Sequence, residues 1–279
     1  MIIRICLEYL EFGTWKIEFM NINLNKRQKI IITAILLTIG LLSTQLVDFN
    51  LRFRFITGLG VAAYILSLWA LWEGINLTKA LILMILPTSY SLAVASFYFL
   101  LPVRWLTRAP VAFIFGLSFY LLLLSQNVFN VASIRTIPLY RAASTASFLF
   151  TLLSAFFIYN VIYAFNLLFF WNGLAVATSS FPLILQSLWS IEMRDRLSAS
   201  IIIQSFILSL VLGELALSFS FWPMSNVIWS LSLSSALYVL LGLTMQVLRG
   251  RATGRVVWEY LGIGVVVFLI SFLATSWTG

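Results

Sequence analysis

The fold is decided by residues 197–248, LSASIIIQSFILSLVLGELALSFSFWPMSNVIWSLSLSSALYVLLGLTMQVL, which contain one charged side chain, Glu214. A helix needs about 20 apolar residues to cross the hydrocarbon core of a bilayer. The stretch is therefore long enough for two crossings joined by a short turn. We predict membrane-spanning helices over residues 198–219 and 225–247.

The composition of the whole chain points to lipid as its main solvent. Of the 279 residues, 62% are hydrophobic and 9% are charged, and the mean hydropathy is +1.03. A soluble domain carries about 25% charged residues. These values exclude a soluble enzyme, a disordered chain and a disulfide-stapled scaffold.

Charged residues divide the rest of the chain into apolar segments of similar length. They give seven further predicted spans, at residues 30–47, 55–73, 80–101, 110–126, 143–163, 168–190 and 256–276. We therefore expect an all-α polytopic transmembrane bundle of about nine spans. It forms a single domain over residues 30–279, after an N-terminal segment of residues 1–29.

Lysine and arginine residues set the expected orientation, because cytoplasmic segments carry an excess of both. With a cytoplasmic N-terminus, the inner segments hold thirteen of them: Arg4, Lys16, Lys26, Arg27, Lys29, Lys79, Arg135, Arg141, Arg194, Arg196, Arg249, Arg251 and Arg255. The outer segments hold four: Arg52, Arg54, Arg104 and Arg108. Treating residues 143–190 as one span would remove this bias. The rule favours nine spans and an external C-terminus.

The first 29 residues differ from the rest. MIIRICLEYLEFGTWKIEFM, residues 1–20, carries five charges and cannot cross a membrane. Two interpretations stay open: the segment lies on the inner leaflet, or it is an upstream extension and Met20 is the natural start.

The chain lacks the side chains that most catalytic and metal sites use. One cysteine, Cys6, cannot form an intrachain disulfide, and without histidine no Ser–His pair exists. No phosphate-binding loop, dinucleotide fingerprint or zinc-protease motif is present. We therefore expect no metal and no cofactor. We also expect no nucleic acid partner, because the lysine and arginine residues that set the membrane topology account for the net charge of +8.

Glu214 is the most unusual residue of the predicted spans. It lies 18 residues beyond Arg196, hence about 27 Å along a helix, in the outer third of the seventh span. An ionisable residue inside a membrane indicates function by default. It is a ligand-binding candidate, as a proton relay or a partner for a cationic group. The structural alternative is a neutral acid bonded to a neighbouring helix or reaching the outer interface.

A second candidate site lies in the predicted inner loop over residues 125–144, SQNVFNVASIRTIPLYRAAS. Arg135 and Arg141 would contact the phosphate of a lipid headgroup or another anionic ligand, with Asn127 and Asn130 beside them. The alternative is that both arginines only fix the topology.

Other polar residues have structural interpretations. Pro87 and Pro182 are expected to kink the third and sixth spans. Arg255 and Glu259 have the spacing of a helical ion pair. Amides and hydroxyls within the spans are expected to join helices by hydrogen bonds: Asn160, Gln186, Gln204, Ser230, Ser234 and Ser235.

Four stretches carry a resemblance to a known family: SQNVFNVASIRTIPLYRAA (125–143), SFPLILQSLWSIE (180–192), LVLGELALSFSFWP (210–223) and EYLGIGVVVFLISFLATSW (259–277). Over residues 110–279 the chain resembles an uncharacterised family of polytopic membrane proteins, a domain of unknown function found mostly in candidate-phylum bacteria. The resemblance implies a multi-pass protein of a bacterial inner (plasma) membrane. It implies no activity or ligand.

From the residues, we expect a non-enzymatic protein that binds or transports a lipid or a small hydrophobic or anionic solute. Membrane lipids are the expected partners, with oligomerisation through the transmembrane helices as a further option. A structural subunit packed against another membrane protein is the alternative. An intramembrane lipid-modifying enzyme is the third hypothesis, which the missing catalytic groups disfavour.

Overall fold

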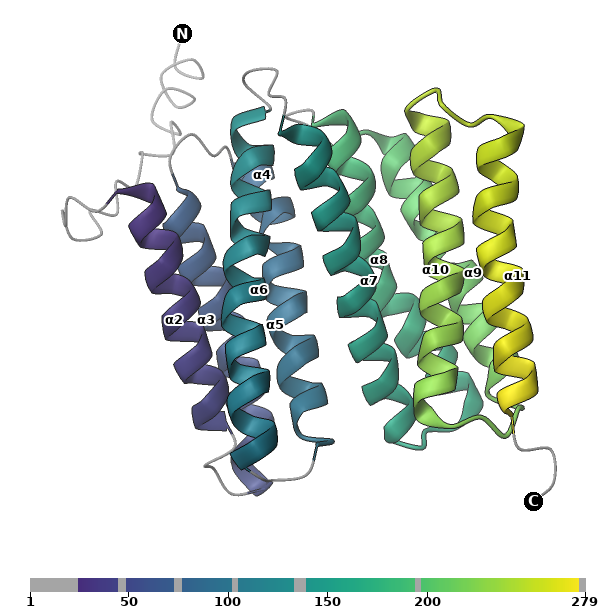
Figure 1. Ribbon diagram of the computed structural model, residues 1–279, viewed down its shortest axis with the longest axis horizontal. Coiled ribbons are helices and arrows are strands. Elements are labelled where there is room, and N and C mark those ends of the chain that lie inside the picture. The colour runs from purple at the N-terminus through teal and green to yellow at the C-terminus, as the bar shows by residue number, and fades with distance from the viewer. Residues whose placement is uncertain are drawn as a thin grey trace, which may run out of the picture.

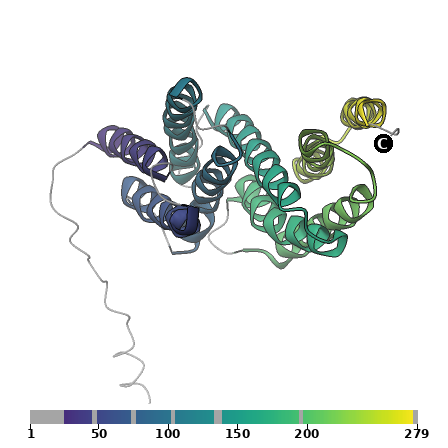
Figure 2. The same ribbon diagram turned by 90° about the horizontal axis from the view of Figure 1, so that it is seen from below.

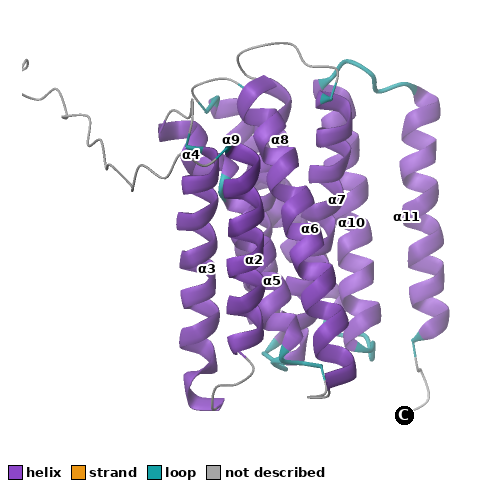
Figure 3. Cartoon of the chain, turned by 60° about the vertical axis from the view of Figure 1, so that its left-hand side comes forward, coloured by secondary structure: helices purple, strands orange, loops and turns teal. Residues whose placement is uncertain are grey.

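The chain folds into a bundle of roughly parallel and antiparallel helices, seen in a computed structural model (Figures 1 and 3). The structure describes residues 25–44, 49–72, 77–101, 105–132, 139–193 and 197–275. Its helices are α2 (Lys26–Thr44), α3 (Phe49–Leu71), α4 (Leu77–Leu83), α5 (Ile85–Tyr98), α6 (Trp105–Ala132), α7 (Tyr140–Ala164), α8 (Phe169–Glu192), α9 (Ala199–Phe219), α10 (Asn226–Leu248) and α11 (Gly254–Ala274). No strand occurs among the described residues.

Nine helices of the described part of the chain are long and apolar enough to cross a membrane, which confirms the predicted fold class. The third of them combines α4 and α5. The bundle alternates direction, so α2 begins at the end where N is marked in Figure 1 and α11 finishes at the opposite end. We call the end that holds the start of α2 and the α10–α11 turn the N-terminal end of the bundle.

The helices are arranged in an elongated array with α2 at one edge and α11 at the other (Figure 2). In the first half, α2 packs on α3 and α6, and α5 packs on α3. The central helix α7 contacts α5, α6, α8 and α10, while α8 and α9 form the closest pair. The last helix, α11, packs against α10, and Ser271 is its buried residue.

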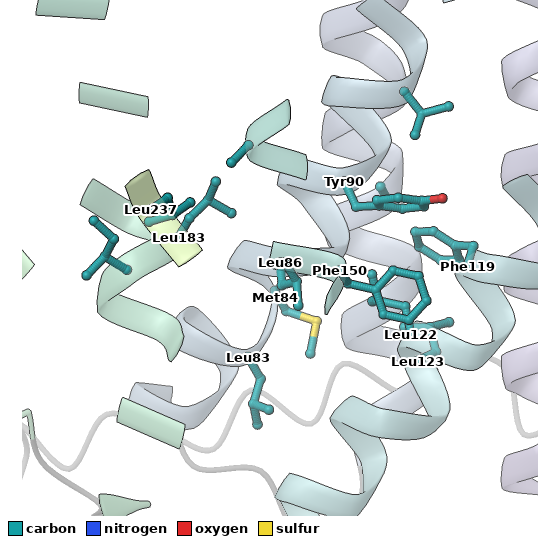
Figure 4. Packing of buried hydrophobic residues seen from close by; sticks show 14 of the residues in the cluster. Leu83, Met84, Leu86, Tyr90, Phe119, Leu122, Leu123, Phe150, Leu183 and Leu237 are labelled. Atoms are coloured by element: carbon teal, nitrogen blue, oxygen red, sulfur yellow. The ribbon is translucent and has the colours of Figure 1, made fainter. Parts of the chain in front are cut away.

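The apolar core joins the two halves of the array through aromatic and leucine side chains. Tyr90 of α5 stacks on Phe115 of α6 with ring centroids 5.9 Å apart, and meets the edge of Phe150 of α7 at 5.5 Å. Figure 4 shows Tyr90, Phe119 and Phe150 gathered around the same point. Such buried aromatic contacts fix the relative positions of α5, α6 and α7.

Proline affects the third span but leaves the sixth continuous. Pro87 has no N–H to offer the carbonyl of Leu83, and its ring crowds that carbonyl. The helix is interrupted at Met84, between α4 and α5, which confirms the predicted irregularity. α8 continues from Phe169 to Glu192 through Pro182 without a break.

Two predicted boundaries are wrong because helices continue past polar residues. α3 begins at Phe49 and contains Arg52 and Arg54, which we had placed in a loop. α6 extends to Ala132, and α7 begins at Tyr140, so most of the predicted loop over 125–144 is helical. Long arginine side chains can reach water from a helix end, and buried amides can bond to neighbouring helices.

Hydrogen bonds between helices confirm part of the predicted polar packing. Asn160 Nδ2 of α7 donates to Ser230 Oγ of α10 at 3.3 Å. Gln186 Nε2 of α8 donates to Gln126 Oε1 of α6 at 3.2 Å. Gln204 differs, because its Nε2 donates to Ser200 Oγ of the same helix.

Candidate functional site

A polar pocket lies at the N-terminal end of the bundle, where α7, α10 and α11 converge beside the α10–α11 turn. Its volume is about 280 Å³, and it is lined by Ser144, Thr145, Phe148, Tyr238, Gly242, Met245, Gln246, Arg249 and Tyr260. These lining residues include a cation, an amide and four hydroxyls, but no carboxylate. We call this cavity the Arg249 pocket.

Arg249 is held in place by α7. It is the C-cap residue of α10, where a cation is favoured by the helix dipole. Its Nη2 donates to Ser144 Oγ at 2.5 Å, and the side chain also interacts with the Tyr140 hydroxyl. That hydroxyl donates to the Ser190 carbonyl of α8 at 2.9 Å. The guanidinium is therefore anchored by a chain of polar contacts across three helices.

Two tyrosine rings form the opposite wall of the Arg249 pocket. Tyr238 of α10 and Tyr260 of α11 stack with centroids 5.0 Å apart. Gly242 permits this contact, because a Cβ at that position would lie 2.2 Å from Cε1 of Tyr260. Gln246 Nε2 donates to the Tyr260 hydroxyl at 3.5 Å, which is a long hydrogen bond.

A second, apolar groove lies along the same three helices and shares one lining residue with the Arg249 pocket. Its volume is about 420 Å³, and it is lined by Leu149, Leu152, Leu153, Phe156, Leu231, Ser234, Ser235, Tyr238, Ile263 and Val267. We call it the α7–α10–α11 groove. Tyr238 lines both spaces. From Arg249 to Leu231 the combined path runs about 27 Å along α10, at about 1.5 Å per residue.

The surroundings of the Arg249 pocket are basic. Arg141 precedes Ser144 and Thr145 by one turn of α7, so it lies on the same face of that helix. Arg251 lies in the α10–α11 turn, and Arg255 lies in the first turn of α11. All three are exposed. Arg255 Nε pairs with Glu259 Oε1 at 3.3 Å, which confirms the predicted ion pair.

The residues predicted to bind a ligand do not form one cluster. Glu214 is exposed on α9 and lines neither the Arg249 pocket nor the α7–α10–α11 groove. Asn127 is half-buried, and buried Asn130 donates from Nδ2 to the Leu71 carbonyl of α3 at 3.3 Å. Arg135 lies outside the described residues. Of the four that the structure describes, Arg141 is the one placed beside the Arg249 pocket.

Sequence reasoning missed the main polar residues of the pocket because it assigned Arg249 to topology alone. A signal was present, since Tyr238, Gly242, Gln246 and Arg249 recur at intervals of four, four and three residues. That spacing puts them on one face of a helix. This helix face combines small, polar and cationic residues at the end of a predicted span, where the helix meets water.

Among the described residues, no group of three or more acidic or cysteine side chains is positioned to hold a metal ion. The donors of the Arg249 pocket instead suit an anion, because arginine and hydroxyl groups donate hydrogen bonds to negatively charged oxygens. The Arg249 pocket is therefore suited to hold an anion through charge and hydrogen bonds.

Comparison with known proteins gives a family but no activity. No curated protein and no solved structure matches this chain. A family model matches residues 70–274. This range includes the Arg249 pocket and the α7–α10–α11 groove, and it starts earlier than the resemblance noted in the sequence. Over those residues the chain belongs to the family described as "Protein of unknown function (DUF5656)".

Proposed function

We propose that this protein binds a membrane lipid, with its headgroup in the Arg249 pocket and an acyl chain in the α7–α10–α11 groove. The observation that carries the proposal is that the two spaces lie along the same three helices and share Tyr238 as a lining residue. A cavity with polar side chains at the helix ends, next to an apolar groove, matches the polar headgroup and apolar chain of one lipid molecule.

The pocket is partly enclosed by protein, which supports binding of a headgroup. Ser144 is 5% exposed and Met245 6% exposed, whereas Thr145 lies at the exposed rim. A headgroup placed there would contact α7, α10 and α11, while its chain remained open to the bilayer along the groove. Access from the membrane therefore requires no passage through the core.

The proposed location is the inner membrane of a bacterium, with the N-terminal end of the bundle in the cytoplasm. The excess of lysine and arginine at that end supports this orientation. The lipid would then be drawn from the cytoplasmic leaflet, where anionic lipids attract basic side chains.

Filling the groove tests the proposal. Ser235 lies on α10 at the groove, and Ser235→Phe would place a ring where the acyl chain is proposed to lie. We expect the purified full-length variant to retain several-fold less co-purifying lipid than the parent, measured by native mass spectrometry. Ser218→Phe, at an exposed position of α9, is the matched control and should retain lipid as the parent does.

The outcome also separates the remaining hypotheses. Equal lipid retention by Ser235→Phe and Ser218→Phe would contradict binding in the groove. A structural subunit would instead lose a co-purifying protein without a change in lipid content. A lipid-modifying enzyme would convert added lipid to product in detergent.

A further inference from the structure

We propose that the lipid bound at this site carries a phosphate group and a net negative charge, and that the phosphate lies between Arg249, Gln246 and Tyr260. The proposal rests on the lipid-binding function and adds the chemistry of the headgroup. It also assigns the headgroup to the leaflet at the N-terminal end of the bundle.

Hydrogen-bond donors converge on the pocket from three helices. The Arg249 guanidinium has five N–H donors, of which one Nη2 hydrogen is used by Ser144 and another donor is engaged by the Tyr140 hydroxyl, so donors remain for a ligand. Ser144 accepts that bond and keeps its own hydroxyl hydrogen for another acceptor. Tyr260 accepts from Gln246 and likewise keeps its hydrogen. α7, α10 and α11 thus each present a donor.

The arrangement of these donors favours phosphate over carboxylate. A carboxylate is planar, and a guanidinium satisfies it through two parallel hydrogen bonds in one plane. A phosphate is tetrahedral and offers acceptor oxygens in several directions. Donors on three different helices match the second geometry, because they approach the cavity from different sides.

Charge favours a net anionic headgroup over a zwitterionic one. Around the pocket, Arg141, Arg249, Arg251 and Arg255 oppose Glu259, and Glu259 is already paired with Arg255. The excess of positive charge attracts an anionic headgroup. No carboxylate lines the pocket to receive the amine of a zwitterionic headgroup.

The apolar groove distinguishes a lipid phosphate from free phosphate. The space below Tyr238 is lined mainly by leucine, isoleucine, valine and phenylalanine side chains, which give nothing to a soluble anion. An acyl chain attached to the phosphate would gain contact with these side chains. The phosphate source is therefore expected to be a lipid.

A competition among lipids tests this inference. The full-length protein is reconstituted in phosphatidylcholine nanodiscs that contain a minor amount of a second lipid. The second lipid is phosphatidylglycerol, phosphatidic acid or oleic acid, which carries a carboxylate, and each is used at the same mole fraction. Native mass spectrometry then measures which lipid is retained. We expect about tenfold enrichment of the two anionic phospholipids over phosphatidylcholine and oleic acid, the effect of one charge-assisted hydrogen bond.

Variants assign the preference to the pocket. Arg249→Gln should abolish the enrichment while total lipid retention persists, and Arg249→Lys should restore part of it. Tyr260→Phe keeps the stacked ring and removes one donor, so it should reduce the enrichment and remains informative if Arg249→Gln does not fold. Arg54→Gln is the matched control, because Arg54 is an exposed arginine of α3, and α3 lines neither the pocket nor the groove.

The possible failures are distinguishable. Retention of lipid without headgroup preference would overturn the phosphate assignment and leave the proposed function intact. Absence of retained lipid in every nanodisc would overturn both. Displacement of the retained lipid by millimolar inorganic phosphate, to the same extent in parent and Ser235→Phe, would show a soluble anion as occupant and would also overturn the inference.

Discussion

Arg249 shows how a half-buried cation is accommodated at the edge of a membrane. A charge removed from water is costly unless partners replace its hydration. Ser144 and Tyr140 of α7 supply part of that replacement, and the C-terminal dipole of α10 adds a favourable field. The Arg249 side chain also lines a pocket that an anion can fill.

Glu214 provides a contrasting prediction at the residue scale. It is exposed on α9, five residues before the last residue of that helix, and does not line the proposed lipid site. Glutamine avoids the cost of a carboxylate on a helix face that meets lipid, so we expect Glu214→Gln to leave the free energy of unfolding unchanged or to raise it. Lipid retention, measured by native mass spectrometry, should equal that of the parent.

The sequence analysis made Glu214 a ligand-binding candidate, and this variant decides between the two sites. If Glu214→Gln lowered lipid retention as strongly as Ser235→Phe, the ligand would have to involve α9, and the assignment to the α7–α10–α11 groove would be wrong.

The closest helix pair, α8 and α9, depends on two glycines that face each other. A Cβ on Gly173 would lie 2.9 Å from the Gly213 carbonyl oxygen, and a Cβ on Gly213 would lie 2.9 Å from that of Gly173. The obstacle is backbone, which cannot rotate away as a side chain can. Small residues permit such close approach between helices in membranes, where packing drives association.

At the scale of this element pair, Gly213→Ala should force α8 and α9 apart. We expect the free energy of unfolding to fall by about 1–3 kcal/mol, the usual cost of overpacking. Unfolding in mixed micelles with increasing fractions of sodium dodecyl sulfate provides the measurement.

The control for that experiment is Gly262→Ala in α11, where an added Cβ meets no atom within 4 Å. It should leave stability unchanged or raise it by up to about 1 kcal/mol, because alanine favours the helix. An equal loss for both variants would mean that the glycine contact between α8 and α9 is not needed.

At the scale of the whole molecule, an odd number of described helices, nine, are long and apolar enough to cross a membrane. The α9–α10 turn lies at one end of the bundle and the α10–α11 turn at the other (Figure 1). If the helices span a bilayer as their length and apolarity indicate, the lipid pocket opens on the side opposite to the α9–α10 turn. The proposed leaflet depends on this arrangement.

Cysteine labelling in sealed vesicles tests the arrangement. In a Cys6→Ser background, single cysteines at Phe221 and Ala252, exposed residues of these two turns, should react with an impermeant maleimide from opposite sides. Permeabilised vesicles, in which both positions should react, control for accessibility. Reaction of both positions in intact vesicles would show that the two turns lie on the same side of the membrane and that α10 does not cross it.

The number of spans was predicted correctly, because the apolar length that a helix needs to cross the bilayer is the same whichever helices it packs against. The errors arose where a polar residue has a distant partner. Asn130 was assigned to a loop, yet it bonds to the carbonyl of Leu71, which is 59 positions away. Gln126 likewise bonds to Gln186. No local pattern identifies such partners.

By itself, the sequence determined that lipid is the solvent, where the chain crosses it and which end carries most of the cations. Only the tertiary structure decided that α7 packs against α10, although α8 and α9 lie between them in the chain. That contact brings Ser144 to Arg249 and places the polar pocket and the apolar groove side by side along the same helices, with Tyr238 lining both. The physical reason is that hydropathy acts on each helix separately, whereas the order of helices in the bundle follows from the shapes of the surfaces that pack together.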